Sequence, residues 1–306
     1  MSILVIGATF VDIKGFPFDN YLPTGRNAGK VEYVHGGVAR NVVEDIANIE
    51  LRPTFLSIVD DTPMGDAVVQ KLKNHKVNTD YVLTRPDGMG TWLAVFDNNG
   101  DVAGSISKRP NMYPIAELLQ EKGDEIFSQV RSVVLEIGLD KEIVKGTLAL
   151  CQKHGVKSFA LVANMSIAAE RRDLLQQFDC VICNQQEAGI LFLDDYEDKT
   201  PEEMREILQE RIAAANIPAM VVTMGAAGAV YANLQGENGV CPARNVQVKD
   251  TTGAGDSFCA GVAIGMTYGK TMAEAVQIGT TLAASVITSS ENVCPRFRPE
   301  ELGIQI

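Results

Sequence analysis

The sequence of 306 residues has no apolar run approaching the roughly 20 residues that a helix needs to cross a bilayer, which argues against a membrane-spanning protein. Basic residues are in the minority, because 27 Lys and Arg stand against 39 Asp and Glu and give a net charge of −12. This charge repels nucleic-acid backbones and anionic lipids, so we expect neither as a partner, although one locally positive site can still hold a small anion. The opening "MSILVIGATFVDI" lacks a basic flank and a small-residue cleavage site. We therefore expect a buried first strand rather than a signal peptide, and a cytoplasmic protein.

Cysteine is also scarce, since six residues in this length are too few for a disulfide scaffold. Cys180 and Cys183 form one C-x-x-C, but a second is missing and the three histidines (His35, His75 and His154) are scattered. The residues between the two cysteines favour a strand, in which positions i and i+3 face opposite sides. The thiols would then diverge, and we interpret them as core residues rather than as a redox or zinc site.

Two common nucleotide-binding motifs are missing. No G-x-x-x-x-G-K-[ST] occurs, and "VIGATFVDI" has one glycine where the dinucleotide fingerprint needs three. A Walker-type loop is thus excluded and a nicotinamide oxidoreductase is disfavoured. The stretch that begins with the first strand has a polar break at Thr9 and is predicted to end in Asp12. Because α/β folds bind ligands at strand ends, Asp12 is either a turn residue or a ligand for hydroxyl groups.

What the chain does contain is a regular alternation of short β-branched runs and longer amphipathic stretches. The predicted strands are 3–8, 53–59, 132–138, 158–163, 180–184 and 219–225, and the predicted helices between them are 39–49, 64–75, 141–155 and 200–216. Continuous apolar strands that alternate with helices indicate an α/β fold, a central mostly parallel sheet sandwiched by helices. We expect residues 1–306 to form a single domain.

Two segments, about 13–35 and 90–107, break this alternation. The first is rich in glycine and proline, and the second has two alternating strands around an Asn99-Gly100 turn, a strong hairpin signal. We predict that they form a small antiparallel β sheet. Such a sheet is either a decorative hairpin or a lid that closes over substrate, and the flanking polar motifs favour the lid. An exposed lid is also a pairing surface, so we expect a homodimer through it.

The segment "DTTGAGDSFCAG", from Asp250 to Gly261, places glycines before a small, apolar helical run. The amides of Gly253, Ala254, Gly255 and Asp256 would then point into one concavity at the positive end of a helix dipole, which suits an anion. Asp256 itself has two interpretations at this point. It is either a helix cap, or a general base beside a transferring phosphoryl group.

A second glycine motif is "HGGVARNVVEDIA", in which Gly36 and Gly37 precede a predicted helix. Paired glycines allow a ligand to approach the backbone closely, and Asn41 can both donate and accept hydrogen bonds, as a polyol requires. The alternative is a tight turn with a cap.

Two further motifs follow predicted strands. In "CNQQEAGIL", Asn184 ends a strand and Glu187 stands where a helix begins, so Glu187 is either part of the helix start or a ligand that holds Mg²⁺ through water. In "VVTMGAAGAVY", Thr223, Gly225 and Gly228 belong to a small-residue loop that suits a nucleotide phosphate or ribose.

Taken in order, "GGVARN", "NQQE", "TMGAAGAVY" and "DTTGAGDSFCAG" resemble the ribokinase-like (PfkB) carbohydrate kinase family over essentially the whole chain. The resemblance implies a central sheet sandwiched by helices, a β lid, and ATP with Mg²⁺ as cofactors. It implies that Asp256 is the catalytic base and that the amides of Gly253, Ala254 and Gly255 form the anion hole.

The same resemblance implies roles for the remaining motif residues. Asp12, Gly37 and Asn41, with Gly36 beside them, match positions that bind sugar hydroxyls. Asn184 and Glu187 match the N-x-x-E associated with Mg²⁺ and the triphosphate, and Thr223, Gly225 and Gly228 match nucleotide contacts. Asp250 and Thr252 match positions that give oxygens to a monovalent cation, often K⁺.

Within the family, "NAGKVEYVHGGVARNVVEDIA" and "DNNGDV" look most like the bacterial pseudouridine kinases, which implies transfer of the γ-phosphoryl group of ATP to the 5′-hydroxyl of the nucleoside. The alternatives are another acceptor (ribose, fructose, a sugar acid or adenosine) or a non-catalytic sensor on the same fold. The chain departs from the family at Thr280, where an Asn is common, and in "ITSSENV", Ile287 to Val293.

Overall fold

The computed structural model describes residues 2–162 and 165–305. Within them, nine strands form the main sheet in the order β13-β12-β11-β10-β9-β8-β1-β4-β5. These strands are β1 (Ser2–Ile6), β4 (Thr54–Val59), β5 (Asn78–Thr84), β8 (Val130–Glu136), β9 (Lys157–Leu161), β10 (Cys180–Asn184), β11 (Ala219–Thr223), β12 (Ala229–Asn233) and β13 (Asn238–Cys241). The pairs from β5 to β11 are parallel, and only β12 and β13 join antiparallel at one edge. The predicted mostly parallel sheet is confirmed.

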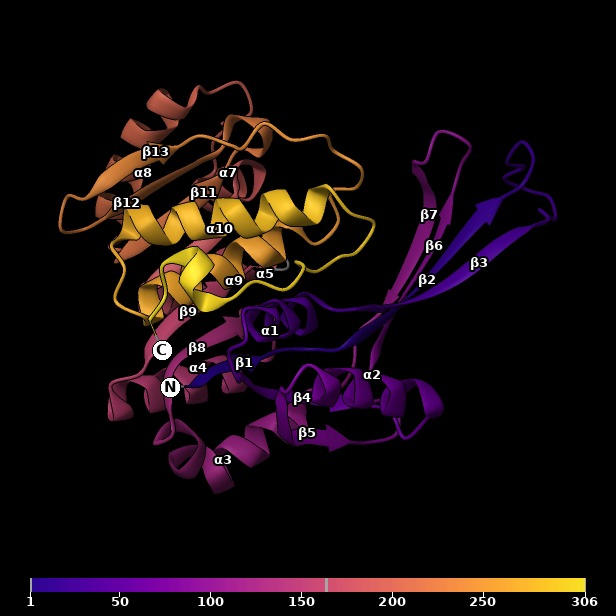
Figure 1. The fold of residues 1–306 in the computed structure, drawn as a ribbon, viewed down its shortest axis with the longest axis horizontal. Coiled ribbons are helices and arrows are strands. Elements are labelled where there is room, and N and C mark those ends of the chain that lie inside the picture. The colour runs from indigo at the N-terminus through magenta and orange to yellow at the C-terminus, as the bar shows by residue number, and fades with distance from the viewer. Residues whose placement is uncertain (1, 163–164, 306) are drawn as a thin grey trace.

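Helices cover both faces of this sheet. One face carries α3 (Tyr113–Phe127), α4 (Lys141–His154), α7 (Gln185–Phe192) and α8 (Pro201–Ala215). The other carries α1 (Val38–Asn48), α2 (Pro63–Asn74), α9 (Ala254–Thr267) and α10 (Met272–Ile287), of which α9 and α10 lie in front of the sheet in Figure 1. Short elements complete the chain: α5 (Met165–Ala169), α6 (Arg172–Leu175), η1 (Gly225–Ala227) and η2 (Pro299–Leu302).

The core explains why these segments become strands. In β1, Leu4 and Ile6 pack into the cluster on one face, while Ile3 and Val5 pack into the cluster on the other. A strand buried on both faces has no polar side, which accounts for the continuous apolar runs. The predicted strands and helices agree with the structure to within a few residues, except that the predicted end of 158–163 lies outside the described residues.

A second sheet contains the two segments that break the alternation. In the described part of the chain it has four strands, β2 (Phe10–Pro17), β3 (Gly29–Gly36), β6 (Gly90–Phe96) and β7 (Val102–Lys108), in the order β3-β2-β6-β7. We call it the small sheet. Each hairpin is antiparallel, and the two hairpins meet through a parallel β2–β6 pair. Figure 1 shows it extending away from the main body.

The start of the small sheet corrects one prediction. The first strand ends at Ile6, and Asp12 lies within β2 rather than at the end of β1. The amide of Gly90 donates to the carbonyl of Thr9 at 2.8 Å and so fixes the point where β2 and β6 leave the body. Among the described residues, no helix is long and apolar enough to cross a membrane.

Candidate active site

Helix α9 begins at the glycine-rich turn. Gly253 is its N-cap residue with φ 81°, and a Cβ there would lie 2.0 Å from the carbonyl oxygen of Asn292, so only glycine fits. The amide of Ala254 already donates to the carbonyl of Thr251 at 3.2 Å. The amides of Gly253, Gly255 and Asp256 make no hydrogen bond within the described residues. Three donors therefore remain free at the positive end of a buried helix.

Asp256 does not cap this helix. The side chain lies in the first turn, and no side-chain cap bond is found for α9. Its Oδ2 instead accepts a hydrogen bond of 2.6 Å from Nδ2 of Asn41, at the start of α1. The two glycine motifs, more than 200 positions apart in sequence, thus meet at one carboxylate, and the second carboxylate oxygen is left for a ligand.

The start of α1 needs glycine for the same reason as the start of α9. Gly37 is the N-cap residue with φ 98°, and a Cβ there would lie 2.7 Å from the carbonyl oxygen of Ala8. One turn on, the buried Arg40 donates to Oδ1 of Asn41 and to the carbonyl of His35. Because Arg40 takes the carboxamide oxygen, the amide group of Asn41 must face Asp256.

Burial raises the pKa of Asp256 to about 7, against the smaller lowering effects of the Asn41 hydrogen bond and the Arg40 charge. Behind it lies Asp45, which accepts hydrogen bonds from the hydroxyl of Ser257 at 2.7 Å and from the amide of Cys294 at 2.6 Å. Burial also raises the pKa of Asp45 to about 7. Two carboxyl groups at the α1–α9 contact therefore titrate near neutrality.

Asp256 opens into a cavity of about 670 Å³, here called the Asp256 cavity, which Asp12, Gly36, Gly37 and Asn41 also line. The carboxylate of Asp12 makes no hydrogen bond or ion pair with the described residues, and burial raises its pKa. Gly36 lies against it, since a Cβ there would be 2.5 Å from Oδ1 of Asp12. The structure thus brings all four predicted hydroxyl-binding residues to one cavity.

Sequence reasoning assigned no role to four individual residues of this cavity: Trp92, Arg109, Glu136 and Asp140. Glu136 ends β8, accepts the amide of Ala8 at 2.9 Å, and has a pKa raised by burial. One signal was available for it, because Glu136 is the only charged residue in the apolar run "SVVLEIG".

A second cavity of about 560 Å³, the Thr223 cavity, lies on the other side of the turn. Its lining includes Thr223, Gly225, Gly228 and Gly255, so the predicted nucleotide residues share one cavity with the glycine turn. Thr280 also lines it, but its hydroxyl donates to the carbonyl of Val276 at 3.0 Å. The Thr223 and Asp256 cavities therefore meet at residues 251–256.

The N-x-x-E motif forms a capping box at the start of α7. Oδ1 of Asn184 accepts the amide of Glu187 at 2.8 Å, and Oε2 of Glu187 accepts the amide of Asn184 at 2.8 Å. Oε1 of Glu187 has no partner among the described residues, and burial raises the pKa of this group. Asn184 lines a groove of about 1040 Å³ that also includes Thr223 and Gly255. The predicted helix start is therefore a full capping box, and it leaves one carboxylate oxygen of Glu187 without a partner among the described residues.

Asp250 and Thr252 form a local turn, in which the amide of Thr252 donates to Oδ1 of Asp250 at 2.8 Å and lowers the pKa of that carboxyl. Thr252 lines the Asp256 cavity, whereas Asp250 is exposed beside it. Among the described residues, no group of three or more His, Cys, Asp or Glu side chains is arranged to hold a metal on its own.

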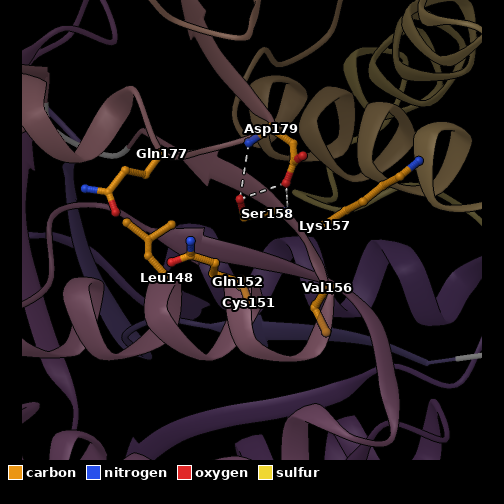
Figure 2. A pocket seen from close by; sticks show the side chains of 9 residues that line it. Leu148, Cys151, Gln152, Val156, Lys157, Ser158, Gln177 and Asp179 are labelled. Atoms are coloured by element: carbon orange, nitrogen blue, oxygen red, sulfur yellow. Dashed lines mark hydrogen bonds between the residues drawn. The ribbon is translucent and has the colours of Figure 1, made fainter.

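Two other features are excluded from the site. Cys180 and Cys183 belong to the core clusters on opposite faces of the sheet, so the thiols do diverge. Figure 2 shows a cavity of about 460 Å³ at the amino-terminal ends of β9 and β10, away from the glycine turn. Two of its polar residues are paired with each other, since Oδ2 of Asp179 accepts both the amide and the hydroxyl of Ser158, at 2.7 and 3.1 Å.

The chain belongs to the pfkB family of carbohydrate kinases, because residues 1–294 match the sequence profile of that family. It is therefore a phosphotransferase that acts on a hydroxyl group of a sugar or a nucleoside.

The relatives divide between nucleosides and sugars. The guanosine-inosine kinase of Exiguobacterium acetylicum is 36% identical over 293 residues, which cover 95% of this chain and 96% of that protein. The pseudouridine kinase of Escherichia coli K12 is 25% identical over 284 residues, covering 90% and 87%. The structure of Arabidopsis thaliana ribokinase complexed with ribose and ATP has a TM-score of 0.87 at 20% identity, covers 98% of both chains, and so shows the same fold.

Proposed function

We propose that this protein transfers the γ-phosphoryl group of ATP to the 5′-hydroxyl of a nucleoside, with Asp256 as the general base. One observation carries the proposal: the carboxylate of Asp256 lies where the Asp256 cavity meets the turn that also borders the Thr223 cavity. An acceptor in the first cavity and a nucleotide in the second would approach each other across that turn, as in-line transfer requires.

On the acceptor side, the free carboxylate of Asp12 would accept hydrogen bonds from ribose hydroxyls, and the backbone of Gly36 and Gly37 would allow the sugar to lie close. Oδ1 of Asp256 would accept the proton of the attacking hydroxyl. The raised pKa of Asp256 makes this carboxylate a better base than an exposed one, and the proton need only move late, as negative charge leaves the hydroxyl oxygen.

On the donor side, ATP would lie in the Thr223 cavity, against Thr223, Gly225 and Gly228. The free amides of Gly253, Gly255 and Asp256 then face the transferring phosphoryl group. Amides held by a buried helix need no reorganisation when charge develops, so they stabilise the transition state more than the ground state. Ala254 contributes to this anion hole only if its bond to Thr251 opens.

The residues at α7 fit a magnesium ion held through water, because Oε1 of Glu187 is unpaired and Mg²⁺ prefers oxygen ligands and keeps part of its water shell. Bound there, the ion would neutralise phosphate charge. Replacing Glu187 by Gln should raise the Mg²⁺ concentration that supports half-maximal rate. Glu203→Gln is the matched control, because Glu203 forms the same capping box at Thr200 on α8. Equal Mg²⁺ dependence in both variants would exclude the role. Asp250 and Thr252 stay a proposed K⁺ site, which rates in K⁺ and in Na⁺ test.

Guanosine and inosine are the favoured acceptors, since the guanosine-inosine kinase relative is 36% identical over nearly the whole chain. Pseudouridine is the second candidate, supported by the motif wording and by the 25% identical pseudouridine kinase. A panel of inosine, guanosine, pseudouridine, uridine, adenosine, ribose and fructose with coupled ADP detection tests both. If no acceptor in the panel gives ADP in the presence of Mg²⁺ and K⁺, the result would favour a non-catalytic sensor.

The small sheet is proposed to act as a lid over the acceptor and as the surface of a homodimer. Its face away from the Asp256 cavity carries a cross-strand apolar row of Tyr33, Ile13, Leu93 and Ile106. Tyr33 is 62% exposed and Ile106 is 70% exposed. A second copy would remove this row from water. Sedimentation velocity should show a dimer for the wild type and a monomer for Ile106→Asp, and a wild-type monomer at all concentrations contradicts the proposal.

A further inference from the structure

We propose that Arg109 and Asp140 together recognise the lactam edge of the acceptor base, a carbonyl oxygen beside an N–H. This inference rests on the proposed function, because it takes the acceptor to be a nucleoside. It defines the accepted class as nucleosides with such an edge, which includes inosine, guanosine, uridine and pseudouridine and leaves out adenosine.

The register of the small sheet shows in which direction a bound nucleoside would extend within the Asp256 cavity. Asp12 of β2 pairs directly with Trp92 of β6, which pairs with Ser107 of β7, so the three side chains lie in one row on one face. All three line the cavity. Neighbouring strands are about 4.8 Å apart, so this row spans about 10 Å from the ribose-binding carboxylate toward the sheet edge. A nucleoside with its sugar at Asp12 would extend its base along this row.

Trp92 gives the base a surface to stack on. It is half-buried, and its ring meets that of Phe96 edge-on with centroids 6.4 Å apart, which holds it in place. The buried Met112 adds apolar surface to the same cavity. A planar, apolar face between these side chains suits any base, so stacking alone does not discriminate.

Arg109 supplies donors at the far end of the row. It follows Ser107 by two positions, just after β7 ends, and it lines the cavity. Its guanidinium makes no hydrogen bond or ion pair with the described residues, and its charge has a small lowering effect on the pKa of Glu136, which lines the same cavity. A guanidinium donates only, so the ligand atom that faces Arg109 must be an acceptor such as a carbonyl oxygen.

Asp140 supplies the matching acceptor. It holds the N-cap position of α4, where an aspartate usually caps, yet its side chain makes no cap bond. The start of the helix is closed without it, because the amides of Ile143 and Val144 donate to the Asp140 carbonyl at 3.0 and 3.2 Å. The carboxylate lines the cavity without a partner among the described residues. An ionised carboxylate accepts only, so the ligand must offer it an N–H.

One donor and one acceptor that line the same cavity match a lactam. In inosine and guanosine these groups are O6 and N1–H, and in uridine and pseudouridine they are O4 and N3–H. Adenosine reverses both, because its amino group would face Arg109 and its N1 lone pair would face the carboxylate of Asp140. Both names found among the relatives, guanosine-inosine kinase and pseudouridine kinase, denote lactam nucleosides. Since both side chains are partly solvated, each is expected to contribute about tenfold to a hundredfold in discrimination.

The test is the ratio of kcat/KM for inosine to kcat/KM for adenosine, measured in the wild type, Arg109→Met and Asp140→Asn. Each variant should lower kcat/KM for inosine by about tenfold to a hundredfold and leave that for adenosine unchanged or higher. Asp140→Asn should favour adenosine most, because a carboxamide can donate to N1. The matched controls are Lys108→Met, which removes the neighbouring cation paired with Asp87, and Glu142→Gln, in the first turn of α4. Both controls should keep the wild-type ratio.

Three results would overturn the inference. The first is a wild type that uses adenosine as well as inosine. The second is an unchanged ratio in both variants while inosine is phosphorylated, which leaves the proposed function intact. The third is phosphorylation of ribose but of no nucleoside, which removes the proposed function as well. Thermal unfolding of each variant checks that the fold is retained, as expected for two exposed side chains.

Discussion

The wall of the Asp256 cavity that α1 and α9 form is buried and paired, whereas the wall formed by the small sheet, Arg109 and Asp140 is exposed and leaves its charges free. Behind the first wall, Arg40 and Glu44 of α1 are each 1% exposed and lie 2.5 Å apart, and Lys71 reaches the same carboxylate at 2.8 Å. On the second wall, neither Arg109 nor Asp140 has a partner among the described residues. The two walls therefore meet two different requirements. The α1–α9 wall holds the base in a fixed geometry, and the exposed wall offers a surface that can differ from one acceptor to another.

The comparison predicts distinct kinetic effects. Variants of the α1–α9 wall should act on kcat and on stability, because they disturb the position and charge of Asp256. Variants of the exposed wall should act on KM and on acceptor choice, because they alter contacts that form only with ligand.

The largest effect is expected for Asp256→Asn. The carboxamide can still accept the Asn41 hydrogen bond, so the fold and the binding of both substrates should persist. It cannot take the proton, so kcat should fall by about 10² to 10⁴. Steady-state kinetics and isothermal titration with the acceptor give both numbers. Full turnover in this variant would remove Asp256 from the chemistry and leave the anion-binding turn as the main catalytic feature.

Arg40→Met should be next, with effects on both stability and rate. It leaves the carboxylate of Glu44 buried with the partly exposed Lys71 at 2.8 Å and His75 at 3.9 Å, which should cost about 3 kcal/mol in the free energy of unfolding. It also frees the carboxamide of Asn41 to turn, so kcat should fall while KM changes little.

The double variant Arg40→Met, Glu44→Met tests the cause. Removing both charges should restore much of the stability but not kcat, because Asn41 stays without its Arg40 partner. Arg52→Met, an exposed position, is the control in urea unfolding. If Arg40→Met and Arg52→Met unfold alike, the buried Arg40–Glu44 pair does not stabilise the α1–α9 wall.

The sequence predicted the sheet, the helices and the motif residues, because each depends on local pattern. It did not predict the buried charges. Arg40, Glu44 and Asp45 have the composition of a solvated helix face, and only packing against α9 and the segment at Cys294, some 250 positions away, buries them. For the same reason, the local sequence could not decide whether Asp256 is a helix cap or a general base, since the deciding contact with Asn41 is also long-range.

A smaller effect is expected in the pH dependence of stability. The pKa of Asp45 is about 7 in the folded protein against an ordinary value of 3.8, so the folded state binds more protons between these values. The free energy of unfolding should therefore fall as pH rises through this window. The lowered pKa of His35 acts in the opposite direction near pH 6, so the informative quantity is the difference between the wild type and Asp45→Asn.

Asparagine imitates the protonated form of Asp45, since it can accept the Cys294 amide and donate to the Ser257 hydroxyl. In urea unfolding at several pH values from 5 to 8, the free energy of unfolding of Asp45→Asn should therefore rise relative to that of the wild type as pH rises. A constant difference across this range would mean that Asp45 is ionised throughout, and that the α1–α9 wall tolerates an unpaired charge.

The smallest effect is expected on the exposed wall, for Trp92→Leu. Leucine keeps an apolar side chain but loses the ring on which a base would stack, so KM for inosine should rise about tenfold. Because Trp92 makes no hydrogen bond to Asp256 or Asn41 within the described residues, kcat should stay close to the wild-type value, and KM for ribose should not change. Phe18→Leu is the control, since Phe18 is 73% exposed near the far end of the small sheet. A loss of kcat in Trp92→Leu would show that the two walls are coupled, and that closure of the small sheet, rather than ligand contact alone, sets the geometry at Asp256.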